Sequence, residues 1–283
     1  MTFTFRRAEP ADRPALWSIC DKIWRGQDPL KAELDAWLTA PDRLMLAVEF
    51  EGRIVGCLGG RWLTPTEGWM GSLRKDPDVP VGGVARASTI ELMRRMQAIQ
   101  PVRQFRGSTS TDQRVQMHVL PTLGFQLIER RTLWLRAPTG AMPRRSAPVT
   151  AGDWAAWQAG LADRHLPPWL NLEWTVYDAA PETLRRHFID RGGWLRLGAP
   201  GAPAAQALVW RDPRYHTVSW LDATDDEARA RLLGHLEAEA GQAGVPVAFF
   251  VDGEADGFAA ELEERGYAMW PAEFLLYEAA PPG

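Results

Sequence analysis

The segment from residue 73 to residue 86 combines a strand, a glycine-rich turn and the start of a helix. It reads Leu-Arg-Lys-Asp-Pro-Asp-Val-Pro-Val-Gly-Gly-Val-Ala-Arg, and its paired glycines are Gly82 and Gly83. Such a turn directs several backbone N–H groups into one concavity, and the helix dipole adds positive potential there. Glycine has no Cβ atom to block the close approach of a ligand. The segment therefore predicts a phosphate or pyrophosphate site, although a paired glycine before a helix also fits an ordinary turn.

The two halves of the chain differ in charge. Lysine and arginine exceed aspartate and glutamate by 5 over residues 1–137, whereas the acidic residues are in excess by 9 over residues 138–283. A basic half suits an anionic ligand and an acidic half repels one. The basic half has no cluster of arginines with interleaved aromatics, so a small anion is favoured and no nucleic-acid partner is expected.

Composition excludes several classes of protein. Hydrophobic residues make up 46% of the 283 positions and charged residues 24%, which is enough for two ordinary cores. Cys20 and Cys57 are the only cysteines, too few for a disulfide framework or a thiolate metal site, so no metal is expected. No stretch resembles a signal peptide or a membrane span. We expect a cytoplasmic protein without a membrane partner, either a monomer or a homodimer.

The sequence repeats itself at a nearly constant distance. Gly124 and Gly266 each precede a strand-like segment that ends in alanine thirteen residues later, at an offset of 142. Further matches join residues 8–12 to 149–153 and residues 85–87 to 228–230, at offsets of 141 and 143. A proline-rich segment without apolar periodicity separates the two copies. These matches indicate a duplication with a linker near residue 140.

Apolar periodicity predicts the same order of elements in each half: strand, helices, strands, helix, strand, helix, strand. Alternating apolar residues on both sides of Glu51-Gly52 predict a hairpin with its turn there. In the first half we expect helices over residues 14–23, 30–38, 84–99 and 112–123, and strands over residues 69–75, 102–108 and 132–136, after a short strand near the start. A mixed α/β domain follows.

This order, the strand–loop–helix segment and the later helix ending in Leu123-Gly124-Phe125 resemble the GNAT superfamily of N-acetyltransferases. The resemblance covers residues 2–137 and, more faintly, residues 148–280. It implies an α/β (α+β) fold of two tandem GNAT domains, each a mixed, mostly antiparallel sheet flanked by helices. The domains would be 1–137, with an acyl-CoA site, and 148–283, degenerate, joined by a linker over 138–147.

The resemblance also implies acetyl-CoA as cofactor. Pro77 falls on the family's proline and Gly83-Val84-Ala85 on its Gly-x-Gly/Ala motif, whereas Pro80 replaces the family's arginine or glutamine. The residues implied in cofactor binding are Leu73 and Lys75 for the pantetheine arm, Val81, Gly82, Gly83, Val84, Ala85 and Arg86 for the pyrophosphate, and Gln113 for a further amide.

The family's usual catalytic groups are replaced. Its glutamate on the middle strand falls on Trp69, and its tyrosine in the later helix falls on Leu120. Glu67 lies on the same strand face as Trp69 and is the nearest candidate for a general base, or else a solvated carboxylate. His118 is two helical positions from Leu120 and faces elsewhere.

Trp24 and Trp69 are candidates for the acceptor site. The resemblance places Trp24 in the wall of that site, where it could meet an apolar or cationic acceptor. Core packing explains these tryptophans as well.

The second half lacks the anion site. Asp225, Asp226 and Glu227 stand where the phosphates would bind, and no glycine is present there. Acidic residues at a helix start stabilise the helix and repel an anion.

Together these features predict an acetyl-CoA-dependent N-acetyltransferase for a small-molecule or peptide amine, with a non-catalytic second domain. One alternative is a non-catalytic acyl-CoA-binding or sensing protein, favoured by the changes at residues 69 and 120. The other is a tandem aminoacyl transferase of the peptidoglycan-bridge type, opposed by the acidic second half because such enzymes bind charged tRNA.

Overall fold

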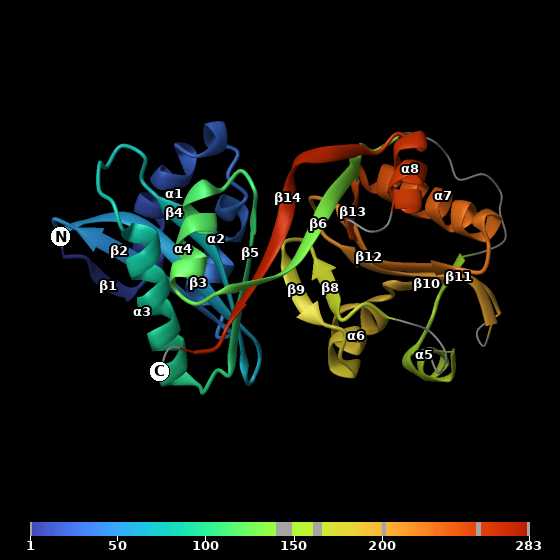
Figure 1. Cartoon of the computed structure of the whole chain (residues 1–283), viewed down its shortest axis with the longest axis horizontal. Coiled ribbons are helices and arrows are strands. Elements are labelled where there is room, and N and C mark those ends of the chain that lie inside the picture. The colour runs from blue at the N-terminus through green and yellow to red at the C-terminus, as the bar shows by residue number, and fades with distance from the viewer. Residues whose placement is uncertain (1, 140–148, 161–165, 200–201, 253–255, 282–283) are drawn as a thin grey trace. The chain divides into compact units, whose positions relative to one another are not determined.

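The computed structural model describes residues 2–139, 149–160, 166–199, 202–252 and 256–281 (Figure 1). They form two compact units, each with its own core. The first unit contains the residues up to Glu129 together with those from Leu275 onward, and the second is Arg130–Phe274.

The first unit is a sheet in the order β1-β2-β3-β4-β5-β14, in which β1 to β4 pair antiparallel and β5 lies parallel to β4. Its strands are β1 (Thr4–Arg7), β2 (Arg43–Phe50), β3 (Arg53–Thr64), β4 (Glu67–Lys75), β5 (Gln104–Ser110) and the end of β14 (Ala268–Ala279). Its helices are α1 (Arg13–Asp21), α2 (Leu30–Thr39), α3 (Val84–Ile99) and α4 (Arg114–Thr122), with 3₁₀ turns at Pro10–Asp12 and Trp24–Gly26.

Two helix pairs cover the two faces of this sheet. Leu92 and Met96 of α3 pack with Phe105 in one buried cluster, whereas Leu16 of α1 and Leu34 of α2 pack in another. The alternation of side chains along the strands separates the two clusters, because successive residues point to opposite faces. The four helices are therefore held by apolar burial on both sides of one sheet.

The second unit repeats this plan with one addition. Its sheet order is β6-β13-β12-β11-β10-β7, with β14 on the other side of β6, and β12 and β13 are the parallel pair. A separate hairpin, β8–β9, follows the first helix. The elements are β6 (Gln126–Arg136), β7 (Val149–Ala151), α5 (Trp154–Gly160), β8 (Trp169–Leu172), β9 (Thr175–Asp178), α6 (Pro181–His187), a 3₁₀ turn at Ile189–Arg191, β10 (Trp194–Ala199), β11 (Ala202–Arg211), β12 (His216–Ala223), α7 (Asp226–Ala243), β13 (Val247–Asp252) and α8 (Asp256–Glu264).

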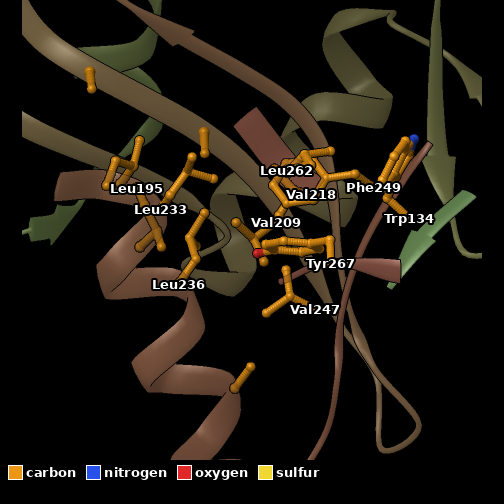
Figure 2. Packing of buried hydrophobic residues seen from close by; sticks show 14 of the residues in the cluster. Trp134, Leu195, Val209, Val218, Leu233, Leu236, Val247, Phe249, Leu262 and Tyr267 are labelled. Atoms are coloured by element: carbon orange, nitrogen blue, oxygen red, sulfur yellow. The ribbon is translucent and has the colours of Figure 1, made fainter. Parts of the chain in front are cut away.

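Each unit is completed by the last strand of the opposite half of the sequence. Residues Arg131 to Arg136 of β6 pair antiparallel with β13, and Trp134 lies in the core of the second unit near Phe249 (Figure 2). Conversely, Leu275 and Tyr277 of β14 are buried in the core that contains α3. Ala280 and Pro281, which follow β14, line one hollow together with Ile90 and Met93 of α3, among elements of the first half (Figure 1).

The equivalent glycines end equivalent helices. Gly124 after α4 and Gly266 after α8 have φ of +82° and +83°. Both are followed by an aromatic residue whose N–H returns to the last helical turn: Phe125 to the Leu120 carbonyl at 3.1 Å and Tyr267 to the Leu262 carbonyl at 2.9 Å. Glycine is favoured there because a Cβ atom disfavours positive φ. The predicted fold class, two tandem units of mixed, mostly antiparallel sheet flanked by helices, is confirmed.

Some predicted boundaries move for local reasons. The turn at Glu51-Gly52 is found, with φ of +50° and +75°. β5 starts at Gln104 rather than at Val102, because the Val102 N–H bonds the side chain of Gln97 at 2.8 Å instead of a neighbouring strand. The β8–β9 hairpin was not predicted.

The predicted domain boundaries, which follow the sequence repeats, stay a prediction. The compact units have other boundaries, because each includes a strand from the opposite half of the sequence. Residues 140–147 of the proposed linker lie outside the described part of the chain. No helix among the described residues combines the length and apolarity needed to cross a membrane.

The exchanged strand gives a direct test. Leu275 is fully buried in the first unit, so Leu275→Ala should lower the free energy of unfolding by roughly 2–5 kcal/mol. Hydrogen exchange should quicken in peptides from α3 and not in those from α7, although α7 is much nearer in sequence. Trp134→Ala is the reciprocal control and should affect α7. The exchange would be refuted if Leu275→Ala loosened α7 alone.

Candidate functional site

The parallel strands β4 and β5 pair over only part of their length. Four residue pairs join them, from Glu67 with Gln104 to Met70 with Gly107. Both strands are fully described, and β4 continues to Lys75 and β5 to Ser110 beyond the last pair. Beyond this point β4 and β5 no longer pair with each other. Parallel strands that separate in this way suit an extended ligand that carries amide groups.

A bulge in β4 lies where the pairing ends. Ser72 has φ of +58°, and the register between β3 and β4 shifts between Cys57 and Gly59. A bulge bends its strand and re-aims the residues that follow. Leu73 comes directly after it and packs against the core that contains α3, and its carbonyl accepts a hydrogen bond from Arg74 at 2.8 Å, so its backbone N–H is the group that could meet a ligand.

The loop after β4 is fixed by its own contacts. The Lys75 ammonium donates to the carbonyls of Val79 at 2.5 Å and Asp76 at 3.1 Å. Val79, Val81 and Val84 are buried in a small cluster with two valines of β2 and β3. Their side chains anchor the loop, so a ligand would meet its backbone. Lys75 serves the same purpose, since its charge is directed into the loop.

The N-terminus of α3 is open. Gly83 is its N-cap residue, with φ of +82°, and no side chain caps the helix or places an acid in its first turn. Gly82 and Gly83 are exposed, and a Cβ atom built on Gly82 would meet no atom within 4 Å. Four backbone N–H groups at a helix start lack internal partners. This end of α3 therefore presents free donors and positive potential to an anion.

Two further predicted residues flank this end. Arg86 is exposed in the first turn of α3. Gln113 is the half-buried N-cap residue of α4, and its backbone N–H donates to the Ser110 carbonyl at 2.9 Å. Its side chain does not cap α4, so the amide stays available near the end of β5.

In the second unit the equivalent helix end is closed. Asp225 is the N-cap residue of α7, and its carboxylate accepts from the Ala228 N–H at 2.8 Å. This hydrogen bond, followed by one from Thr224, lowers the pKa of Asp225, so the position is negatively charged. Asp226 and Glu227 add two acids in the first turn. An anion would meet its own sign of charge here.

In the second unit, the hairpin β8–β9 covers the parallel strands β12 and β13. The Ser219 hydroxyl of β12 donates to the Asn171 carbonyl of β8. Trp174, at the hairpin turn, stacks edge-on against Phe250 of β13 with ring centroids 6.2 Å apart. The hairpin thus contacts β12 and β13 beyond their last pair, at Val218 and Phe249. In the second unit the hairpin therefore occupies the region beyond the last pair of the parallel strands. The described part of the first unit has no such hairpin.

Glu67 lies in a buried charge network. The Arg106 guanidinium, 4% exposed, donates to Glu278 at 2.9 Å and to Gln104 at 2.9 Å, and contacts Glu67 at 3.5 Å. The contact with Arg106 orients the Glu67 carboxylate.

The residues at the family's catalytic positions are packed in the protein. Trp69 is 4% exposed, and its indole Nε1 lies 3.4 Å from where a Cβ atom on Gly71 would be. Leu120 is buried in the core with α3 and carries no proton to donate. His118 is exposed on α4. Trp24, by contrast, is 50% exposed.

Sequence reasoning missed Arg106, Glu278, Asp28 and Arg74. Glu278 joins Arg106 across 172 residues of sequence. Asp28, with no exposed side-chain surface, forms two hydrogen bonds to Arg74, at 2.6 and 2.8 Å. The available signal was a charged residue within an apolar strand pattern, at Arg74 and Arg106, since such charges are paired when buried.

The two thiols are not candidates for chemistry. Cys20 and Cys57 are free and buried. Burial raises the pKa of each to about 12, so both stay protonated and poorly nucleophilic near neutral pH. A covalent route through cysteine has no support here. Among the described residues, no group of His, Cys, Asp and Glu is placed to hold a metal ion.

Known structures share this fold over the whole chain. A tandem GNAT protein from the clavulanic acid biosynthesis pathway, solved without acetyl-CoA, matches with a TM-score of 0.63 and 14% identity, over 100% of this chain and 99% of that one. A GCN5-related N-acetyltransferase from Sphaerobacter thermophilus matches with a TM-score of 0.64 and 14% identity, over 99% and 96% of the two chains. No protein-family model and no curated protein matches the sequence. At these identities the likeness shows the fold, so the tandem GNAT architecture read from the sequence is confirmed.

The open end of α3 can be closed by one substitution. Gly83→Asp gives α3 the N-cap residue of α7, and a bound phosphate would then face a carboxylate. Two unit charges about 4 Å apart interact by roughly 4 kcal/mol at an effective dielectric near 20. That corresponds to a loss of about a hundredfold or more in acetyl-CoA affinity, measurable by calorimetry.

Gly83→Asn is the matched control, because it has the same shape and the same positive φ without the charge. It should retain most of the affinity of the parent protein. Equal binding by Gly83→Asp and Gly83→Asn would show that no anion binds at this helix end.

Proposed function

We propose that the protein is an acetyl-CoA-dependent N-acetyltransferase whose cofactor site lies in the first unit. The observation that carries the proposal is the uncapped, acid-free N-terminus of α3 directly after a strand that has left its parallel neighbour. A pyrophosphate suits the N–H groups at this helix start, and the amides of an extended arm suit the backbone where β4 and β5 no longer pair. The neighbouring folds named as acetyltransferases support acyl transfer in general.

Some of these residues would bind acetyl-CoA, and others would orient the reacting groups. The backbones of Gly82, Gly83, Val84, Ala85 and Arg86 would hold the pyrophosphate, whereas the Val81 N–H donates to the Val79 carbonyl at 2.8 Å and would fix the loop. The backbones of Leu73 and Lys75, with the Gln113 amide, would hold the arm. Bound acetyl-CoA would supply an acyl group activated as a thioester. The β4 backbone near Leu73 would polarise the acyl carbonyl, a role that suits a preorganised N–H group.

Proton removal from the acceptor amine is assigned to Glu67. Its carboxylate lies at the start of β4 and is oriented by Arg106 at 3.5 Å. Six strand positions, roughly 20 Å, separate it from Leu73, so it would accept the proton through a chain of water molecules. Because Leu120 cannot donate a proton, the departing thiolate would be protonated from solvent or from the acceptor itself. Positioning then accounts for most of the rate enhancement.

A second candidate function is acyl-CoA binding without catalysis. It is favoured by the packed Trp69, the aliphatic Leu120 and the ion-paired Glu67. The two functions share the cofactor site and differ only in turnover.

Release of coenzyme A from acetyl-CoA with a panel of primary amines tests the proposal. Acetyl-CoA alone, at about a hundred times its Kd, should stabilise folding by about 2.7 kcal/mol in a thermal melt. Stabilisation with turnover supports the transferase, and stabilisation without turnover of any amine supports the sensor. Absence of any stabilisation would refute both.

The role of Glu67 is tested separately. Glu67→Gln should lower kcat by roughly 10²-fold and remove the acidic limb of the pH–rate profile, with acetyl-CoA affinity unchanged. Glu278→Gln also loosens Arg106 but keeps the Glu67 carboxylate, so it should preserve the shape of the profile. Equal kcat losses with unaltered pH profiles in both variants would assign Glu67 to structure alone.

A further inference from the structure

Trp24 has an unusual backbone and an exposed ring. Its φ is +46° and that of Arg25 is +57°, both in the left-handed region that side-chain-bearing residues rarely adopt. Half of the Trp24 surface is exposed. Such conformations persist where the surrounding structure fixes them, and they concentrate at binding sites. The fixing contacts can be identified here.

A buried ion pair holds the indole. The Arg74 guanidinium lies 4.6 Å from the centroid of the Trp24 ring and makes two hydrogen bonds to Asp28. Burial acts to lower the pKa of Arg74, but the hydrogen bonds and charge of Asp28 outweigh it, and the pKa is raised. Arg74 is thus permanently charged and fixed in place. We call Trp24, Arg74 and Asp28 the Trp24 platform.

The platform lies beside the unpaired end of β4. Arg74 is two residues after the bulge at Ser72, a distance of about 7 Å along a strand. It is in register with Cys57, which packs with α1 and α2, whereas Leu73 packs on the α3 side. The platform is therefore on the sheet face opposite α3, within reach of a molecule that meets the β4 backbone at Leu73.

The chain just before Trp24 is also held, by contacts with the loop that follows β4. The Lys22 ammonium contacts Asp76 at 2.9 Å and Asp78 at 2.8 Å. The segment from Lys22 to Asp28 is thus tied to the chain before and after the end of β4. The position of Trp24 is set by the same loop that would hold the pyrophosphate.

The charges around Trp24 limit what its ring can bind. A guanidinium already occupies one face, so a cation on the other face would share the same π electrons at roughly 9 Å from Arg74. Arg25 adds a positive charge on the same segment, whereas the charge of Lys22 is paired with Asp76 and Asp78. A neutral aromatic or apolar group meets no such repulsion and stacks well on an indole.

We propose that the Trp24 platform selects the acceptor, favouring primary amines that carry a neutral aromatic or apolar group over polyamines. This inference rests on the proposed acetyltransferase function and goes beyond it by naming the acceptor class. Trp24 acts by contact with the part of the acceptor that does not react.

Steady-state kinetics with 2-phenylethylamine and putrescine as acceptors test the proposal. The parent protein should show a higher kcat/KM for 2-phenylethylamine. Trp24→Ala should lower that value by roughly tenfold, mainly through KM, and leave putrescine within twofold. Trp24→Phe should restore most of the loss. Trp17→Ala is the matched control, because Trp17 is 37% exposed but packs against Arg13 and Lys31 of α1 and α2.

Three results would overturn the proposal: preference for putrescine by the parent protein, equal losses for both amines in Trp24→Ala, or an effect of Trp24→Ala on acetyl-CoA affinity instead of on the acceptor. A binding measurement covers the case of no turnover. In protein labelled with 5-fluorotryptophan, the ¹⁹F resonance missing from Trp24→Phe is that of Trp24. In the presence of coenzyme A it should shift with 2-phenylethylamine and not with putrescine. An unmoved resonance overturns the acceptor inference, whereas failure of the acetyltransferase function appears separately as absent turnover.

Discussion

The early end of the pairing between β4 and β5 is the constraint on which the candidate site depends. Parallel strands that stay in register satisfy each other's backbone groups and leave nothing for a ligand. Here β4 and β5 are each held by the strand on their other side. β4 stays paired with β3 through the bulge at Ser72. β5 lies beside β14, whose Leu275 and Tyr277 are buried in the core with α3. A bulge bends its strand, so β4 turns away from β5 after Met70 while it stays paired with β3.

The two units show how few residues separate an open helix end from a closed one. Both place a helix after the middle strand, and both hold a glycine-ended helix later on. The N-cap residue is Gly83 in one and Asp225 in the other. A capping carboxylate satisfies the helix by itself, whereas a glycine leaves the N–H groups to be satisfied from outside. The opposite charges of the two halves agree with this difference. At this position, a carboxylate that caps the helix also repels an anion, whereas a glycine that admits an anion leaves the helix uncapped.

Much of the fold was readable from the sequence because the local signals were strong. The helix predicted over residues 84–99 is α3 to the residue, and the glycine turn at residues 51–52 is where the hairpin turns. The strand exchange was not readable. The segments of β6 and β14 are similar in pattern, so neither indicates which sheet it joins. The same applies to the site: the turn chemistry at Gly83 is local, whereas Arg106 meets Glu278 only through the three-dimensional fold.

The exchanged strands also bear on how such a chain can be made. A ribosome delivers β1 to α4 long before the strand that lies beside β5, so the first sheet waits with an open edge while some 150 further residues are synthesised. The first unit cannot mature ahead of the second, as consecutive domains usually do. Its final step is a contact between distant parts of the chain, which is intrinsically slow. Folding of the first unit, with its candidate active site, is therefore coupled to synthesis of the acidic half of the chain.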